Sequence, residues 1–329
     1  MRFYFVAVML VPYLLHGQPK SQTQYITTDI TNFWQMFDQL AQAKTEQDTI
    51  NLIQTRYLIK MSTGLGNYIH INQVESKIDV LAAYLKMIRN YSDYLHSIRA
   101  ATESIPTYEP LFNQTYQQLT QLYSPFKVPK AYFSIGFLNG AARSFGDSVL
   151  YIGAEFSCVS DKPDFRKTPL WLPSVTTSVG RVNEVLAHEA THNQQARPAT
   201  NPYGFLYNAW VEGGAVLMVD LITRGKKLVS NAAGINERTY QYGMAHEKEL
   251  WQEFKADLLV GDIRQDKWFY NGATPERPKD LGYFIGYRMC LAYYNQAKDK
   301  QQAIKDILSA TDYSTILKRS NYEETLKKR

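Results

Sequence analysis

Two histidines four residues apart flank a glutamate in the segment Leu186-Ala187-His188-Glu189-Ala190-Thr191-His192. On a helix, residues four apart lie on the same face, so the imidazoles of His188 and His192 can reach one cation together. Imidazole is a common ligand of Zn²⁺, and the H-E-x-x-H pattern is typical of catalytic zinc sites. Glu189, next to the first ligand, can act as the general base toward a water that the metal activates. The segment therefore predicts a zinc site, and the alternative is a solvated helix with two surface histidines.

A catalytic zinc usually takes three protein ligands and leaves a position for water, so a third ligand is needed. Glu212 is the best candidate, because it follows in an apolar stretch that predicts a second helix. Residues 197–204, between the two helices, contain prolines and a glycine and predict a turn that lets the helices pack together. The sequence thus predicts one Zn²⁺ bound by His188, His192 and Glu212.

Two histidines followed by a glutamate at this spacing resemble the ligand set of thermolysin-like and other gluzincin metallopeptidases. There is one departure, because the aspartate that these enzymes place one turn after the glutamate is Val216 here. Asp220 lies two turns along, so the carboxylate that orients a ligand histidine must come from elsewhere. Glu184, one turn before His188, is a candidate substitute.

Other segments extend the resemblance. Together with the H-E-x-x-H helix, Ser148–Glu155, Val211–Ala215 and Asp280–Arg288 are similar to the ordered landmarks of a bacterial family of predicted zinc-dependent proteases. That family is itself similar to the gliding-motility lipoprotein B group, and the resemblance covers about residues 128 to 320. It implies a zincin-like metallopeptidase fold in the cell envelope, and it implies no particular substrate.

Two tyrosines in the last of these segments are candidate catalytic groups. Tyr283 and Tyr287 are four residues apart, so both hydroxyls could point into one cleft and donate a hydrogen bond to the transition state. The alternative is that both are buried and serve only packing. Gly282 and Gly286 share a face of the same helix, and this spacing predicts close helix packing inside a soluble core.

Composition limits the class of partner. Of the 329 residues, 45% are hydrophobic and 20% are charged, which is ordinary for a globular protein. The net charge of +5 comes from dispersed lysines and arginines and a basic end, residues 326–329. Without a basic stripe interleaved with aromatic residues, we expect no nucleic-acid partner. The expected partner is a peptide or protein substrate.

The first residues have the pattern of a secretory signal. Arg2 precedes an apolar run from Phe3 to Leu15, which is short for a membrane span, and Gly17 is a plausible cleavage position. We therefore expect a signal peptide at residues 1–17, a periplasmic or secreted location, and no stable membrane span. No cysteine follows the run, so we expect no lipoprotein acylation. An uncleaved anchor or a buried segment is the alternative.

The elements that must position the site divide the rest of the chain in two. Residues 18–125 have apolar positions at helical spacing and predict a helical N-terminal region, with Asp29 as a cap and Gly64–Asn67 as a turn. The expected helices there are Ile30–Gln42, Val74–Ile88 and Tyr116–Tyr123.

Residues 126–329 predict the catalytic domain. Ala131–Phe137 and Ser148–Phe156 read as strands of a small sheet, and Arg238–Leu259 and Asp280–Ala297 as helices. In zinc peptidases of this kind a sheet edge beside the metal can accept an extended peptide as an added strand. The loop 161–174 can border the cleft. The expected fold class is α+β and mostly helical.

The only two cysteines are Cys158 and Cys290. In an exported protein they could form a disulfide, and two separate buried thiols are an equal alternative. The sequence as a whole predicts an exported zinc-dependent metallopeptidase. The alternatives are a non-catalytic envelope or motility factor that retains the fold, and a zinc hydrolase of non-peptide amides.

Overall fold

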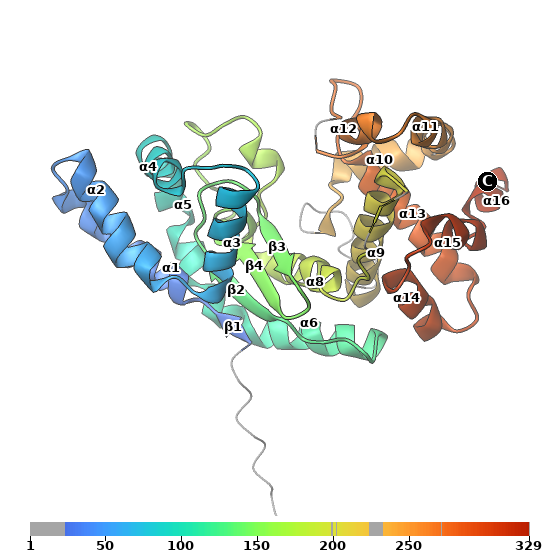
Figure 1. Ribbon diagram of the computed structural model, residues 1–329, viewed down its shortest axis with the longest axis horizontal. Helices are drawn as coiled ribbons and strands as arrows, with labels where there is room; N and C mark the ends of the chain where they lie inside the picture. The colour runs from blue at the N-terminus through green and yellow to red at the C-terminus, as the bar shows by residue number, and fades with distance from the viewer. Residues whose placement is uncertain (1–23, 199, 202, 224–232, 271, 329) are drawn as a thin grey trace, which may run out of the picture.

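The structure is a computed structural model that describes residues 24–198, 200–201, 203–223, 233–270 and 272–328. The predicted signal peptide, residues 1–17, lies outside these residues. The fold is α+β and mostly helical with one small sheet, as the sequence predicts. The N-terminal helices and the sheet lie on one side of the molecule and the C-terminal helices on the other, with α8 and α9 between them (Figure 1).

The sheet has four strands in the order β1-β2-β4-β3. β1 and β4 both run parallel to β2, and β3 pairs antiparallel to β4 at one edge. β2 and β4 confirm the two predicted strands, whereas β1 and β3 were not expected because they are too short or too polar to give a strand pattern. The strands are β1 (Tyr25–Ile26), β2 (Lys130–Ser134), β3 (Ala142–Phe145) and β4 (Val149–Gly153).

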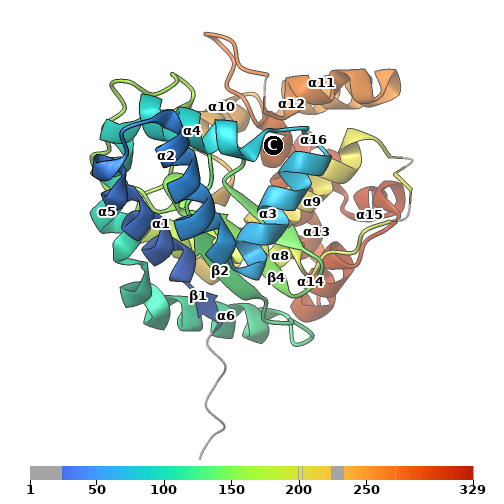
Figure 2. The ribbon, with the colours of Figure 1, turned by 60° about the vertical axis from the view of Figure 1, so that its left-hand side comes forward.

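The N-terminal helices pack against this sheet. In Figure 2, α1 and α3 lie in front of the sheet and α8 lies behind it. One hydrophobic core includes Phe33 of α1, Leu150 of β4 and Leu186 of α8, so residues on both sides of position 125 share it. The helices of this half are α1 (Thr28–Gln39), α2 (Glu46–Leu52), α3 (Thr63–Val74), α4 (Val80–Asn90), α5 (Ser92–Glu103), α6 (Glu109–Leu122), α7 (Ala154–Ser157) and α8 (Val182–His192).

Asp29 does not cap its own helix as predicted. It lies inside the first turn of α1, is almost fully buried, and its carboxylate accepts hydrogen bonds from Ser62 N at 3.0 Å and Ser134 Oγ at 2.7 Å. Ser62 is in turn the residue that caps α3. The prediction was wrong because the carboxylate joins two distant segments rather than its own helix end.

The segment Gly64–Asn67 is helical and not the predicted turn. It forms the start of α3, where a Cβ on Gly64 would lie 2.2 Å from the Cβ of Tyr132 on β2. The glycine is therefore needed for the close approach of a helix to the sheet. Predicted helix Val74–Ile88 is likewise interrupted, because Asp79 caps a new helix, α4, through Ala82 N.

The C-terminal helices form a second core around α9 and α13, with Trp210, Phe254 and Phe284 inside it. The predicted helix Arg238–Leu259 is two helices that meet at His246, and the predicted helix Asp280–Ala297 is α13. The helices of this half are α9 (Phe205–Thr223), α10 (Glu237–Ala245), α11 (Glu247–Val260), α12 (Gln265–Trp268), α13 (Leu281–Gln296), α14 (Lys300–Leu308), α15 (Tyr313–Arg319) and α16 (Tyr322–Lys327).

Glycines let α9 and α13 touch backbone to backbone. A Cβ on Gly213 would lie 2.0 Å from the carbonyl carbon of Gly286, and a Cβ on Gly286 would lie 1.7 Å from the carbonyl oxygen of Ala209. The predicted close packing at Gly286 is confirmed. Among the described residues, α9 is also the one helix long and apolar enough to cross a membrane, and 67% of that stretch is buried inside the structure.

Cys158 and Cys290 are free thiols. Cys158 lies in the core shared by the sheet and the N-terminal helices, and Cys290 lies in the core around α13. Of the two alternatives, the structure has separate buried thiols, because each cysteine belongs to a different core.

Candidate metal centre

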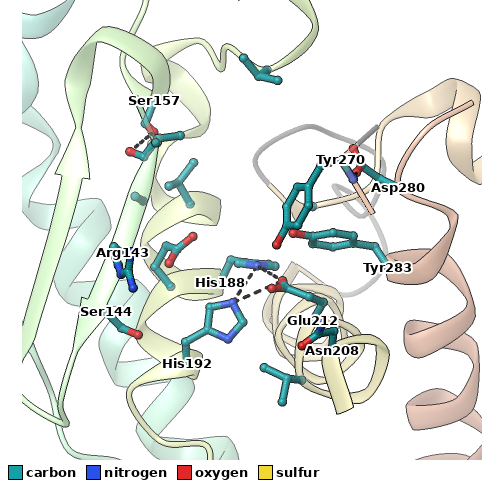
Figure 3. Close-up of a pocket in the computed structure, with 18 of the residues that line it drawn as sticks. Arg143, Ser144, Ser157, His188, His192, Asn208, Glu212, Tyr270, Asp280 and Tyr283 are labelled. Atoms are coloured by element: carbon teal, nitrogen blue, oxygen red, sulfur yellow. Dashed lines mark hydrogen bonds and ion pairs between the residues drawn. The ribbon is translucent and has the colours of Figure 1, made fainter. Parts of the chain in front are cut away.

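Helices α8 and α9 bring the three predicted ligands together. His188 Nε2 lies 3.2 Å from Glu212 Oε2 and 3.2 Å from His192 Nε2, and His192 Nε2 lies 3.4 Å from Glu212 Oε2. Figure 3 shows the two imidazoles on α8 facing the carboxylate on α9. His188 and His192 share a face because they are one turn apart, and Glu212 reaches them because α9 packs against α8.

The donor set fits a zinc ion. A tetrahedral zinc with bonds of roughly 2.1 Å holds its ligand atoms about 3.4 Å apart, which is close to the three separations found here. Two imidazoles and one carboxylate are ligands that zinc accepts readily. Among the described residues, these three form the one group of histidine and acidic side chains close enough together to hold a metal ion.

Electrostatics within the cluster favour a charged carboxylate. Burial alone would neutralise Glu212, but the charge of His192 and the hydrogen bonds from both histidines outweigh it and hold the pKa of Glu212 below its usual range. Burial likewise opposes a charge on His192, and the adjacent Glu212 overcomes this and raises the pKa of His192 to about 9. Glu212 is thus in the form that binds a cation.

Gln195 contacts one of the predicted ligands. Its Oε1 lies 2.7 Å from His192 Nδ1, and its Nε2 donates to the carbonyl oxygen of Val211 at 2.6 Å. The side chain therefore fixes the ring of His192 and ties the end of α8 to α9. The sequence analysis did not identify Gln195. Its position three residues after His192 could have indicated it, because residues three apart at a helix end lie close together.

The other predicted histidine ligand, His188, has no such partner among the described residues. His188 Nδ1 is buried and has no hydrogen-bond partner among the described residues, so the substitute predicted for this role, Glu184, does not fill it. Glu184 is fully buried and pairs with Arg181 at 3.0 Å. Asp220 accepts a hydrogen bond from Tyr287. Instead, Gly234 packs against the ring, since a Cβ there would lie 3.0 Å from His188 Cε1.

Glu189 lines the same cleft as the three ligands. It follows His188 directly and lies on the side of α8 that is partly exposed. Its charge acts on His192. This placement meets the first requirement for a general base, which must face the space where a substrate would lie.

Only one of the two predicted tyrosines reaches the cleft. Tyr283 lines it, and its ring lies 6.4 Å from the ring of His188 between centroids. Tyr287 is one turn further along α13 and is buried, and its hydroxyl donates to Asp220 Oδ2 at 2.8 Å. It is not among the described residues that line the cleft, because α9 covers that turn of α13.

Tyr270 is a cleft residue that sequence reasoning missed. Its hydroxyl and that of Tyr283 interact above the predicted metal ligands (Figure 3). Tyr270 is 59% exposed, but desolvation of its hydroxyl in the cleft and the charge of Glu212 raise the pKa of Tyr270 to about 12, so the hydroxyl stays protonated and can donate. The backbone is left-handed at φ 62°, which is strained for a bulky residue, and Asp280 Oδ1 holds its N–H at 2.8 Å.

The cleft has a volume of about 690 Å³ and lies between the two cores. One wall is the edge strand β3 with the residues before it, Gly140–Ser144. The opposite wall carries Tyr270 and Tyr283, and α8 with α9 forms the floor (Figure 3). A free strand edge thus lies beside the ligand cluster.

The sequence matches the family model of gliding motility protein GldB over residues 16–324. The chain belongs to the GldB family. Comparison with curated proteins and with solved structures gives no match. Membership supports the gliding-motility part of the predicted resemblance and agrees with a location in the bacterial cell envelope. The match also includes the N-terminal helices, which share a core with the sheet.

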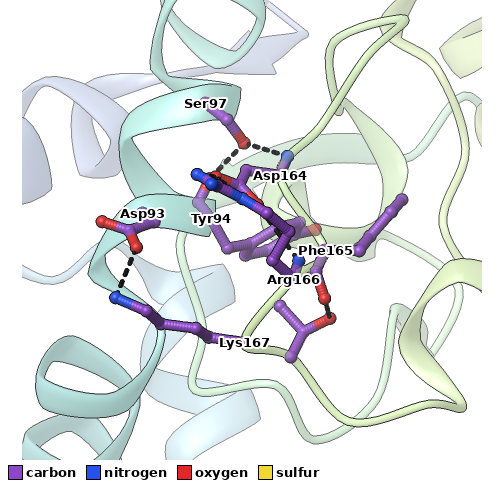
Figure 4. A network of polar contacts seen from close by, with 8 residues as sticks. Asp93, Tyr94, Ser97, Asp164, Phe165, Arg166 and Lys167 are labelled. Carbon is purple, nitrogen blue, oxygen red and sulfur yellow. Dashed lines mark hydrogen bonds and ion pairs between the residues drawn. The ribbon is translucent and has the colours of Figure 1, made fainter.

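In this GldB-family chain, the loop 161–174 is attached to the N-terminal helix α5. Asp164 N donates to Ser97 Oγ at 2.8 Å, and the ring of Phe165 stacks on Tyr94 with centroids 5.6 Å apart (Figure 4). Of the predicted loop, Ser174 is the one described residue that lines the cleft, followed by Val175 and Thr177. Helix α5 therefore holds the loop at Asp164 and Phe165, before the part that lines the cleft.

A buried carboxylate holds the chain that follows β2. Glu155 is fully buried and its Oε2 accepts the N–H of Gly136 at 2.8 Å, in the stretch that leads to β3. Its Oε1 and the hydroxyl of Tyr151 have no hydrogen-bond partner among the described residues. Burial raises the pKa of Glu155 to about 7, against the opposing effect of backbone N–H donors.

Proposed function

We propose that this protein is an exported zinc metallopeptidase with a zincin-like catalytic domain, which hydrolyses peptide bonds in the periplasm or outside the cell. One observation carries the proposal: Glu189 lines the same cleft as the clustered ligand atoms of His188, His192 and Glu212. A purely structural zinc site closes its fourth position with protein and has no need of a general base in an open cleft.

Each residue has a defined part in the proposed reaction. His188, His192 and Glu212 would hold the zinc, which when bound supplies a Lewis acid that polarises a carbonyl and makes water more acidic. Glu189 takes the proton from the attacking water and delivers it to the leaving nitrogen. Tyr270 and Tyr283 lie across the cleft from β3, where a protonated hydroxyl can donate to the oxyanion of the substrate.

In this proposal the substrate peptide binds along the edge strand β3. β3 pairs with β4 on one side only, so its other edge is free for an extended peptide. Backbone hydrogen bonds to such an edge hold a peptide largely without regard to its sequence. This would align a scissile bond between β3 and the ligand cluster.

The family match favours a second candidate, a non-catalytic gliding-motility factor that retains the fold and uses the metal as a structural element. Such a protein would bind zinc and show no turnover. The two candidates therefore differ in catalysis and agree in metal binding.

The test combines metal analysis with a peptide library. We expect about one zinc per purified chain, lost in the His188→Ala, His192→Ala and Glu212→Ala variants, and cleavage of library peptides detected by mass spectrometry. Zinc retained with unchanged affinity in Glu212→Ala would rule out the ligand set. Zinc binding without cleavage across broad libraries would favour the motility factor.

A further inference from the structure

We propose that the cleft selects peptides that carry a carboxylate, and that Arg197 binds this group. The inference rests on the proposed function, because it assumes that a peptide lies along β3. It goes further by assigning a chemical class of substrate and a residue that determines it.

The backbone of β3 shows where such a peptide would lie. Gly153 N donates to Ala141 O, and the register pairs Ala142 with Ile152 and Ser144 with Leu150. Because hydrogen-bonded and non-hydrogen-bonded pairs alternate in an antiparallel ladder, the N–H and C=O groups of Ala142 and Ser144 point away from β4. These groups are on the free edge and are available to a substrate strand.

Arg197 lies at this edge with most of its donors unused. Its Nη2 donates to Ser144 Oγ at 3.1 Å, it lines the cleft, and it is exposed. Among the described residues, no carboxylate lies within ion-pair distance of its guanidinium. The group has five N–H donors in a planar fork that matches a carboxylate. It is therefore held in place by a neutral hydroxyl while its charge remains uncompensated.

The charges of the cleft are divided between its walls. Among the described lining residues, the β3 wall with Arg197 contains two arginines and no acidic side chain. The carboxylates lie on α8, α9 and the start of α13, where Lys279, the one further lysine or arginine of the described lining, pairs with Asp280 at 3.6 Å. Arg143, the other arginine, pairs with Glu75 at 3.4 Å, and both are about half exposed. Of the two, Arg197 is thus the one without a carboxylate partner.

Neighbouring side chains of a strand point to opposite faces, and so do those of a peptide added beside it. The side chain of Ser144 points to the face of the strand where Arg197 lies. The side chain of Arg143 points to the other face, toward Glu75 at the end of α3. A peptide carboxylate on the Ser144 side would meet Arg197. It can be an acidic side chain or the chain terminus, since both present the same group.

The test measures binding, so that it does not depend on turnover. Zinc-loaded Glu189→Gln protein is titrated with short fluorescent peptides in which a single Glu is moved through a Gln-containing sequence, each as free acid and as terminal amide. We expect one Glu position, or the free acid, to lower the Kd on the order of tenfold, as for a charge-assisted hydrogen bond. An added Arg197→Gln change should abolish this gain, and Arg197→Lys should retain part of it.

Lys127→Gln is the matched control, because Lys127 is an exposed cation paired with Asp147 outside the lining of the cleft. It should leave the gain unchanged. Equal Kd values for all Glu and Gln peptides, or a gain that survives Arg197→Gln, would overturn the inference. Cleavage of the same peptides by the wild-type protein reports separately on the proposed function. If carboxylate peptides bind more tightly but no peptide is cleaved, the peptidase proposal alone is contradicted. If peptides are cleaved but carboxylate peptides bind no more tightly, the assignment of Arg197 alone is contradicted.

Discussion

Gln195 holds the imidazole of His192 by a contact of 2.7 Å from its amide oxygen to Nδ1, while its amide nitrogen bonds to the backbone of α9. The amide oxygen can only accept, so Nδ1 of His192 carries a proton in this contact, and a bound metal would take the place of the proton on Nε2. One side chain thus contacts both the ring of a predicted metal ligand and the backbone of α9.

We expect Gln195→Ala to lower zinc affinity by about 10-fold to 100-fold, the usual effect of losing a group that orients a metal ligand. Competition with a chelator of known affinity would measure this. Gln194→Ala is the control, since Gln194 is adjacent and bonds to Lys127 rather than to a ligand. Equal affinities in both variants would show that Gln195 does not orient His192.

Glu189→Gln should bind zinc normally and lose nearly all peptidase turnover, by about a hundredfold or more. The amide keeps the size of the side chain but cannot accept a proton. Turnover on a library-derived peptide, with metal content measured on the same sample, tests this. Full activity in a zinc-loaded Glu189→Gln sample would contradict the proposed mechanism.

Tyr270→Phe should reduce kcat more than Tyr287→Phe, because the first hydroxyl lies in the cleft and the second donates to Asp220. We expect a loss of roughly tenfold or more for Tyr270→Phe, as for a removed transition-state donor. Tyr287→Phe should act mainly on the free energy of unfolding, by about 1 kcal/mol. Measuring kcat and chemical denaturation for both variants separates the two roles, and the reverse order would refute this assignment.

Glu155 should make the protein less stable as pH rises. Its folded-state pKa is raised to about 7, so the folded state holds this proton more tightly than the unfolded state does. The stabilisation of the folded state by this proton is fully present below the usual carboxyl pKa. It is lost as pH rises through about 7, which lowers the free energy of unfolding by about 3 kcal/mol. Glu155→Gln does not titrate, so denaturation at pH 5 and pH 8 should show a smaller drop in the variant. Parallel pH profiles would contradict the burial argument.

The sequence by itself determined the parts of the site that local periodicity encodes. His188 and His192 share a helix face because they are four residues apart, and the apolar stretch around Glu212 predicted the second helix. The two central strands were also recognisable, since β4 has a continuous buried run. In each case neighbours in the chain carry the signal.

Tertiary structure decided what faces the ligands. Tyr283 and Tyr287 have equivalent positions in the sequence pattern, and they differ because α9 touches α13 at Gly213 and Gly286 and places Asp220 against the second tyrosine. Tyr270 lies in the cleft with a left-handed backbone conformation. No motif in its segment of the sequence signals that conformation. Such contacts join residues far apart in the chain, so they depend on how the helices pack, which periodicity along one helix does not encode.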